Sequence, residues 1–519
     1  MQLGSLLIAK GLISKDDLER AVAHQQSNGG RLGDCLVELG LLSAEQIEGV
    51  MREAPQSPRS LADTDLDPVF LLQLMVKGMY TESLETPSQI AKAMKLPSAA
   101  ANALLESAVE RKVAEAAGQS QNGNGAIAEM RYTLSRVGRD WATESLEQCQ
   151  YFGPAPVSLD AYRAQIMRQR IGNERVTRPM MDEAFADLVI PERFLGRLGP
   201  AINSSSAILI HGPAGNGKTT IAEKIGAIFQ DVIYIPYCFE VDGQIVKVFD
   251  PSVHHSIQDE AGPAAGRGLR REQWDQRWVP CQRPMVVTGG ELTLGMLDLK
   301  FNEIAKFYEA PLHIKALNGT FLIDDFGRQL AKPEDILNRW IVPLNSRVDY
   351  LSLHTGKSIQ LPFDELVIFS TNMRPNDLMD PAFQRRISYK LKTVAPSEPL
   401  FRQVFEELAA KHDLELTDEI YRQVIKTIRA SGAPLAYFQP KFIVEQVLVS
   451  CKFEGVEPCL TRENVEDAML NLFVDDDDDA PAPAPEAAAD EDLAAPQALP
   501  EEAISQRVRL VHDGLTPRG

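Results

Sequence analysis

The sequence predicts a chain of several domains whose largest part is a doubly wound α/β domain, with smaller modules before and after it. Its 519 residues are more than one compact domain usually holds. Three short apolar runs, at 207–210, 320–323 and 366–371, end in glycine or polar residues, as buried parallel strands do. Hydrophobic residues make up 44% of the chain and charged residues 24%, so most of it can bury a core.

The net charge of −20 is spread unevenly. Residues 475–519 contain 12 acidic and 3 basic residues among many alanines and prolines, a composition that does not support a packed core. We therefore expect 474–519 to be a disordered acidic tail. The remaining residues are also acidic on balance, which argues against general coating of nucleic acid because that needs a positive field.

The sequence also indicates where the chain resides. No apolar run approaches the roughly 20 residues that span a bilayer, and the N-terminus lacks the pattern of a secretory signal. The six cysteines are scattered and form no CxxC pair, so neither a zinc knuckle nor a disulfide framework is indicated. We expect a cytoplasmic protein with free thiols and no membrane insertion.

An internal repeat occupies residues 1–54. The triplet Gln-Leu-Gly at 2–4 recurs 29 residues later as Arg-Leu-Gly at 31–33. Each copy predicts a short helix, a glycine break and a second helix that begins at Ser14 or Ser43, each followed three residues later by an acid or amide. We expect a small all-α module whose two halves pack together.

Residues 67–150 show a different pattern, after a polar linker. Three predicted helices are followed by a Gly/Asn-rich hairpin at 118–125, a strand near 130–134 and a last helix. This order is typical of a winged-helix-like α+β module. Its candidate recognition helix, 98–112, carries two basic residues offset by two acidic ones, so protein contact is favoured over reading of DNA, although the DNA alternative stays open.

The strongest motif lies at the start of the α/β region 179–395. The run 207–210 is followed by GxxxxGK[ST] and then by a predicted helix, the context expected of a P-loop. Glycines let successive main-chain N–H groups wrap around phosphates, Lys218 would bridge two of them, and the Thr219 hydroxyl would bind Mg²⁺. The predicted ATP-binding residues are Gly212, Pro213, Ala214, Gly215, Asn216, Gly217, Lys218, Thr219 and Thr220.

Polar residues end the two other strands of this region. Asp324 would hold the Mg²⁺ shell and Asp325 would polarise an attacking water, with capping of the next turn as the alternative for Asp325. Asn372 would orient that water beside the γ-phosphate, with an Asx turn as its alternative. The pair Arg385 and Arg386 suits an arginine finger that reaches a neighbour's nucleotide, and a surface basic pair is the alternative.

These motifs, in this order and followed by a helical region at 397–473, resemble an AAA+ ATPase. The resemblance implies a helical lid over a P-loop core, a ring oligomer that is usually a hexamer, and ATP sites at its subunit interfaces. Three departures stand out. The acidic motif ends in Asp325 rather than glutamate, Lys441 stands where the family has a lid arginine, and about 240–316 is extra length.

Within the extra length we expect loops. Residues 286–290 predict a hairpin-like break, and the aromatic pair Phe307 and Tyr308 has two interpretations. It could grip a substrate in a central pore, or it could pack in an ordinary core.

The repeat in 1–54 is similar to the N-terminal domain of type II secretion and type IV pilus ATPases. In that family two such motifs, separated by five residues, bind cyclic di-GMP, and the spacer 26–30 has this length. The resemblance implies cyclic di-GMP as a ligand of 1–54. Gln2 and Ala54 depart from the family pattern, and a pure docking module is the alternative.

Three functions remain open from the sequence. The first is an ATPase that remodels or assembles an unknown protein client, regulated through 1–54. The second is an ATP-dependent regulator that binds DNA through 67–150. The third is a scaffold that senses ATP with little turnover, because Asp325 is one methylene shorter than the usual glutamate.

Overall fold

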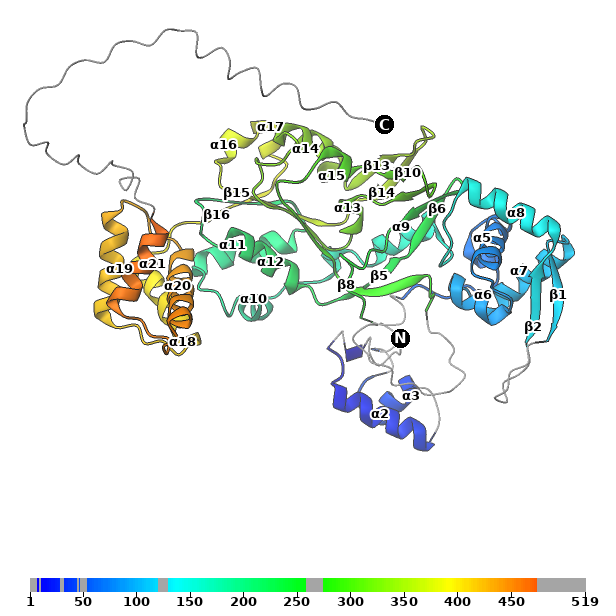
Figure 1. Ribbon diagram of the computed structural model, residues 1–519, viewed down its shortest axis with the longest axis horizontal. Helices are drawn as coiled ribbons and strands as arrows, with labels where there is room; N and C mark the ends of the chain where they lie inside the picture. The colour runs from blue at the N-terminus through cyan, green and yellow to red at the C-terminus, as the bar shows by residue number, and fades with distance from the viewer. Residues whose placement is uncertain are drawn as a thin grey trace, which may run out of the picture. The chain divides into compact units, whose positions relative to one another are not determined.

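Figure 1 shows the computed structural model of the chain. It describes residues 7–8, 11–28, 32–43, 46, 54–119, 129–257 and 274–473. Residues 1–472 form one compact unit, and the expected acidic tail 474–519 lies outside the described residues. No helix among the described residues is long and apolar enough to cross a membrane.

The centre of the chain is a five-stranded sheet in which every neighbouring pair is parallel. Its spatial order is β9–β12–β15–β4–β16, so the last strand lies beside the first and β15 is inserted between β4 and β12. The expected α/β class is confirmed. The strands are β4 (Ile208–His211), β9 (Met285–Thr288), β12 (Thr320–Ile323), β15 (Leu366–Thr371) and β16 (Tyr389–Lys392).

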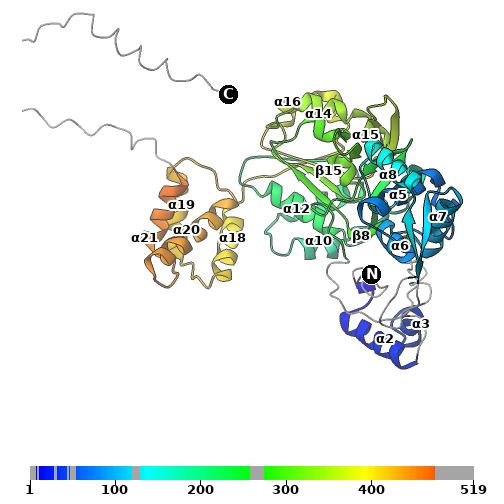
Figure 2. The same ribbon diagram turned by 45° about the vertical axis from the view of Figure 1, so that its right-hand side comes forward.

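Helices cover both faces of this sheet, because alternate strand residues point to opposite sides. Ile208 and Ile210 pack with α10, α11 and α12, whereas Leu209 packs with α14 and α17 on the other face. Figures 1 and 2 show α10 and α12 on one side and α14 and α16 on the other. These helices are α10 (Arg178–Ala184), α11 (Glu192–Asn203), α12 (Lys218–Ile228), α13 (Leu312–Lys315), α14 (Pro333–Arg339), α15 (Ile341–Ser346), α16 (Pro375–Leu378) and α17 (Pro381–Gln384).

One expectation for the extra length is wrong. Residues 286–290 were expected to form a hairpin-like break, but Met285–Thr288 is strand β9, the edge of the parallel sheet beside β12. The strand is only four residues long and two glycines follow it, so the sequence pattern that would indicate a strand is weak. Its strand state depends on pairing with β12, which local patterns do not reveal.

Most other strands of the extra length belong to what we call the second β layer, together with strands from before and after that stretch. It contains a sheet of order β10–β11–β7–β6–β3, the pair β5–β8 and the hairpin β13–β14. Tyr308 is 1% exposed and lies in the core of this layer. For this member of the aromatic pair, the structure therefore shows core packing, one of the two interpretations. The strands are β3 (Val157–Ser158), β5 (Val232–Pro236), β6 (Cys238–Val241), β7 (Gln244–Lys247), β8 (Trp278–Gln282), β10 (Lys300–Asn302), β11 (Phe307–Glu309), β13 (Val348–Ser352) and β14 (Ser358–Pro362).

The segment 151–178, which the sequence suggests is a connector, is part of this packing. It contains β3, helix α9 (Leu159–Arg168) and the short helix η2 (Ile171–Asn173). Tyr162 and Ile166 of α9 are buried in the core of the second β layer. The connector therefore belongs to the folded body of the protein.

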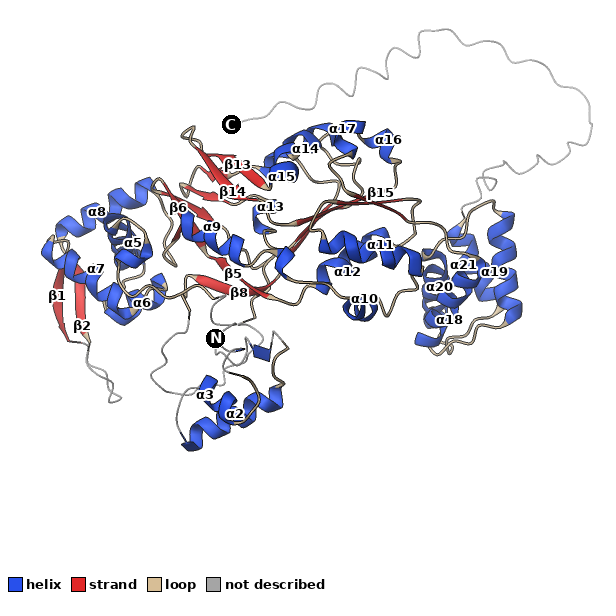
Figure 3. Cartoon of the chain, turned by 180° about the vertical axis from the view of Figure 1, so that it is seen from behind, coloured by secondary structure: helices blue, strands red, loops and turns tan. Residues whose placement is uncertain are grey.

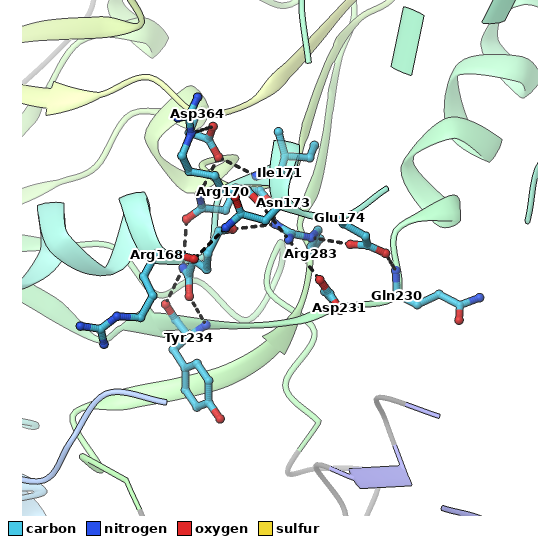
Figure 4. A network of polar contacts seen from close by, with 12 residues as sticks. Arg168, Arg170, Ile171, Asn173, Glu174, Gln230, Asp231, Tyr234, Arg283 and Asp364 are labelled. Atoms are coloured by element: carbon cyan, nitrogen blue, oxygen red, sulfur yellow. Dashed lines mark hydrogen bonds and ion pairs between the residues drawn. The ribbon is translucent and has the colours of Figure 1, made fainter. Parts of the chain in front are cut away.

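A buried polar network joins this connector to the two sheets (Figure 4). Arg283 lies between β8 and β9, and its side chain is 3% exposed. Its guanidinium pairs with Glu174 at 3.0 Å and with Asp231 at 3.7 Å. The same group donates to the carbonyl oxygens of Gln169, at 3.0 Å, and Asn318, at 2.7 Å. One arginine thus satisfies main-chain groups from both layers.

Residues 67–150 contain the expected helices and the strand near 130–134, whereas most of the expected hairpin at 118–125 lies outside the described residues. Helices α5, α6 and α7 are followed by the antiparallel pair β1–β2 and by α8, around one apolar core. Figure 3 shows β1 and β2 as a two-stranded pair next to α7. The assignment to the winged-helix class stays a prediction. The elements are α5 (Pro68–Thr81), α6 (Pro87–Met94), α7 (Ser98–Glu110), β1 (Ala114–Gln119), β2 (Met130–Leu134) and α8 (Arg136–Gln148), with the short helix η1 (Ala62–Thr64) before them.

Two helices are described in the N-terminal repeat, α2 (Lys15–Asn28) and α3 (Leu32–Glu38). Both expected serine caps are confirmed. The Asp17 N–H donates to Ser14 Oγ, and the Ser14 N–H donates to the Asp17 carboxylate, both at 3.1 Å. The same reciprocal bonds join Ser43 and Gln46, at 3.1 and 2.8 Å.

Four helices follow β16 and form what we call the four-helix module. They are α18 (Glu398–Lys411), α19 (Asp418–Ala430), α20 (Phe438–Glu454) and α21 (Arg462–Leu472). Helix α19 is amphipathic, with Ile420, Val424 and Ile428 buried along one face. Its role as a lid stays a prediction. The remaining short helix, η3 (Leu294–Leu297), packs with α13 and α14.

We predict that Arg283→Ala lowers the free energy of unfolding of the central part by about 3–5 kcal/mol, because Glu174 would keep a charge that is largely buried and has lost its partner. Chemical denaturation followed by tryptophan fluorescence measures this. Arg131→Ala is the matched control, since its ion pair with Glu85 is exposed and should contribute about 1 kcal/mol or less. Equal effects of the two substitutions would contradict the role given to the network.

Candidate functional site

The glycine-rich loop, residues 212–217, connects buried strand β4 to helix α12 as the motif predicts. Gly212, Gly215 and Gly217 all have positive φ angles, of 148°, 73° and 70°. Glycine adopts such angles without the strain that a Cβ introduces. The loop therefore curls at the helix N-terminus, where main-chain N–H groups carry a partial positive charge.

Two of these glycines also allow close approach. A Cβ on Gly212 would lie 2.4 Å from the carbonyl oxygen of Thr393, and one on Gly215 would lie 2.2 Å from Cδ1 of Phe438. Phe438 opens helix α20, and its N–H donates to the carbonyl oxygen of Gly215 at 3.1 Å. The four-helix module thus contacts the loop directly.

Lys218 is the first residue of α12 and is 6% exposed. Its ammonium donates to the carbonyl oxygen of Pro213 at 2.9 Å and to Asn372 Oδ1 at 2.5 Å. Burial lowers the pKa of Lys218 from its ordinary value, while the charges of Asp325 and Asp324 oppose that shift. The cation is therefore partly desolvated and held at the loop by neutral oxygens.

The two aspartates that end β12 have different surroundings. Asp324 is partly buried, and its Oδ2 accepts a hydrogen bond from the Thr219 hydroxyl at 2.8 Å. Asp325 is exposed and has a left-handed backbone with φ of 47°. Aspartate tolerates that conformation better than most residues. Hydroxyl and carboxylate oxygens side by side are a donor set that suits Mg²⁺.

Asn372 follows β15 and joins the loop to the carboxylates. Its Oδ1 accepts from Lys218, and its Nδ2 donates to Asp325 Oδ1 at 3.0 Å. This bridge exists because β15 lies between β4 and β12, so that the ends of all three strands meet at one edge. The side chains of Asn372 and Asp325 are hydrogen-bonded to each other, and both residues line the cavity beside the loop; their catalytic roles stay predictions.

One supporting residue escaped the sequence analysis. The Gln329 side chain donates to the carbonyl oxygens of Asp324 and Asp325, at 2.9 and 3.2 Å, and accepts from the Gly327 N–H at 2.8 Å. These bonds fold the turn back on itself and fix both aspartates. A glutamine six residues after a strand carries no recognisable motif, so no sequence signal could have found it.

A cavity of about 850 Å³ adjoins the loop, the carboxylate Asp325 and the first helix of the four-helix module. One part of its wall is apolar and comes from Leu188, Val189 and Ile190, just before α11, with Phe438 from α20. Sequence reasoning missed this wall, because a short apolar run in a loop resembles ordinary core. The expected lid residue Lys441 also lines the cavity.

Arg385 and Arg386 are not brought to this cavity. Arg385 is exposed, and Arg386 donates to the carbonyl oxygen of Ala382 at 3.3 Å within its own short helical turn. The site therefore unites Lys218, Thr219, Asp324, Asp325 and Asn372 and leaves the arginine pair outside.

The second predicted site, for cyclic di-GMP in 1–54, falls largely outside the described residues. Gln2, Arg31 and the spacer residues Gly29 and Gly30 are among those not described. Ala54 is described and fully buried.

Comparisons with known proteins give similarities of limited reach. A family model described as "Domain of unknown function (DUF8689)" matches residues 397–471, which is the four-helix module. No curated protein matches the chain.

Several solved structures resemble part of the chain. A RuvB mutant from Thermotoga maritima has a TM-score of 0.33 at 14% identity and covers 58% of this chain and 75% of its own. NtrX from Brucella abortus has a TM-score of 0.33 at 15% identity, and the match covers 63% of this chain and 66% of NtrX. Domain III of the replication initiation protein DnaA from Thermotoga maritima has a TM-score of 0.31 at 13% identity, and the match covers 57% of this chain and 98% of that domain. Because every one of these TM-scores is below 0.5, the likenesses support no inference about this chain.

We predict that Gly215→Ala lowers the thermal unfolding midpoint more than Gly217→Ala does. Both substitutions place alanine at a left-handed φ, at a shared cost of about 1–2 kcal/mol, but only the Cβ at 215 collides with Phe438. Differential scanning calorimetry compares the two variants. Adding Phe438→Ala to Gly215→Ala should recover part of the loss, and equal midpoints for the two single variants would contradict the close contact.

Proposed function

We propose that this chain is an ATP-hydrolysing P-loop enzyme of the AAA+ type that remodels or assembles a protein client. The observation that carries the proposal is the bridge from Lys218 through Asn372 to Asp325, next to the Thr219–Asp324 contact and beside a large cavity. A phosphate-binding loop, an oxygen donor pair and a carboxylate for water activation are the parts that hydrolysis of ATP needs.

In the proposed complex the glycine-rich loop would bind the phosphates with its main-chain N–H groups, and Lys218 would leave Pro213 and Asn372 to contact the β- and γ-phosphates. The apolar wall of Leu188, Val189 and Ile190 suits the flat adenine ring. The partial desolvation of Lys218 favours this exchange, since the ammonium gains charged partners in place of neutral ones.

Hydrolysis would then depend on Asp325 and Asn372. Asp325 would accept a proton as water attacks the γ-phosphorus and the bond to the leaving ADP oxygen breaks, while Asn372 would orient that water. The hydrogen bond between the two side chains, at 3.0 Å, supports this pairing because it holds them side by side. Thr219 and Asp324 would hold Mg²⁺, which neutralises phosphate charge when bound.

A ring oligomer, which is usually a hexamer in the family that the motifs resemble, would bring an arginine from a neighbouring subunit to each site. Arg385 and Arg386 lie away from the chain's own cavity, and Arg385 is exposed. A planar guanidinium on an exposed turn can reach the γ-phosphate of a neighbouring subunit and stabilise charge that develops there. The proposal therefore needs a second copy of this chain to complete each site.

Two finer points rest on resemblance alone. Regulation by cyclic di-GMP at 1–54 stays a prediction, as does the identity of the client. The DNA-binding alternative is weaker, because the only basic residues of the candidate helix 98–112, Arg111 and Lys112, lie at its end and are balanced by the exposed Glu106 and Glu110. The low-turnover alternative is the outcome in which ATP binds but phosphate release stays slow.

We predict that Lys218→Ala abolishes Mg²⁺-dependent ATP hydrolysis and weakens ATP binding, because the phosphates lose their cation. Asp325→Asn should keep ATP binding but reduce turnover by about 100-fold or more, since the amide has the same shape and accepts no proton. Phosphate release and calorimetric ATP titration measure the two effects. Full activity of Lys218→Ala would show that the site is misassigned, whereas slow turnover in the unaltered protein with tight binding would favour the scaffold.

A mixing experiment tests the arginine pair. Lys218→Ala protein has a dead site but intact arginines, and the double variant Arg385→Ala with Arg386→Ala has an intact site without them. We predict that each is inactive alone and that their mixture regains part of the activity, because mixed assemblies contain complete interfaces. Failure of the mixture, with assembly shown by light scattering, would contradict a role in a neighbour's site.

A further inference from the structure

We propose that His24, Cys35 and Glu38 form a binding site for a divalent transition metal, most simply Zn²⁺, which clamps the two halves of the N-terminal repeat. His24 lies on α2, and the other two residues lie on α3. One ligand atom from each residue lies within 4.8 Å of the ligand atoms of the other two. This site is separate from the ATPase centre and does not depend on the proposed function.

The packing of the two helices brings these side chains together. Ala21, one turn before His24, is fully buried in a cluster with Leu32 and Leu36 of α3. Cys35 and Glu38 are three residues apart and so project from the same face of α3. His24 Nε2 lies 3.1 Å from Glu38 Oε2, and Cys35 is 1% exposed just behind them.

The repeat itself argues that this cluster has a purpose. With the 29-residue shift between copies, Cys35 corresponds to Leu6 and Glu38 to Ala9. The second copy thus replaces two apolar residues by metal-ligating ones, and both replacements face the one histidine of α2. Cysteine also packs as a small apolar residue, but together the two replacements bring a thiol and a carboxylate within 4.8 Å of one imidazole, which packing alone does not require.

The chemistry of the three donors selects the metal. A thiolate, an imidazole nitrogen and a carboxylate oxygen suit Zn²⁺ and related ions, whereas Mg²⁺ and Ca²⁺ prefer oxygen ligands alone. The His24 side chain is 26% exposed and that of Glu38 is 64% exposed, so water can complete a tetrahedral shell. Without a metal, the same residues would be a surface ion pair above a buried thiol, which contributes little to stability.

The test uses full-length, reduced, metal-stripped protein titrated with Co²⁺ in the presence of excess Mg²⁺. Mg²⁺ occupies oxygen-ligand sites such as the ATPase centre, so only a thiolate site should give a sulfur-to-cobalt charge-transfer band with visible tetrahedral bands. We expect these bands at one equivalent of Co²⁺ and their loss on adding Zn²⁺. Cys35→Ser should abolish the charge-transfer band, and Cys459→Ser, at an exposed cysteine far along the chain, should leave it.

Two further variants keep the result decisive if Cys35→Ser disturbs the buried core. His24→Gln and Glu38→Gln change partly exposed side chains, and each should weaken Co²⁺ binding by about tenfold or more while circular dichroism stays unchanged. Absence of the charge-transfer band in the unaltered protein would overturn the proposal. So would a band that survives Cys35→Ser, because another cysteine would then be the ligand.

Discussion

The order of strands in the central sheet is the constraint on which the candidate site depends. Because β15 lies between β4 and β12, the residue after β15 falls between the glycine-rich loop and the two aspartates. That residue is Asn372, and its amide has one acceptor and one donor, which it uses on Lys218 and Asp325 respectively. If β4 and β12 were direct neighbours, the ammonium and the carboxylates would meet without an intermediate. The amide instead keeps a cation and an anion apart beside the glycine-rich loop.

The four-helix module meets this arrangement at one point. Phe438 donates its N–H to the carbonyl oxygen of Gly215, and its ring occupies the space where any Cβ on that glycine would be. A carbonyl used in this way fixes the orientation of one peptide group of the loop. The module therefore does more than line the cavity, because it also contributes to the shape of the glycine-rich loop.

The sequence predicted the features that are local in the chain, and those that need distant partners escaped it. Lys218, Thr219 and the glycines stand in one continuous motif, and the caps at Ser14 and Ser43 each involve four residues, so patterns suffice. Asn372 was singled out because it ends an apolar strand. Strand β9 and the turn held by Gln329 have no such mark, since they depend on pairing with β12 and on bonds within an irregular turn. Tyr308 shows the same limit, because an aromatic residue in an inserted segment is buried only once the second β layer is assembled.

The contacts of the buried Arg283, between β8 and β9, place the N-terminal boundary of the central domain before residue 179, where the sequence pattern puts it. A shortened protein that began at residue 179, where the α/β pattern starts in the sequence, would lack Glu174, the Gln169 carbonyl and helix α9. Arg283 would then keep the Asn318 carbonyl but, as a charged partner, only a distant, half-exposed aspartate, and the apolar surface that Tyr162 and Ile166 cover would face water. Such a fragment should aggregate rather than fold, so the smallest piece that folds autonomously around the central sheet has to begin before β3.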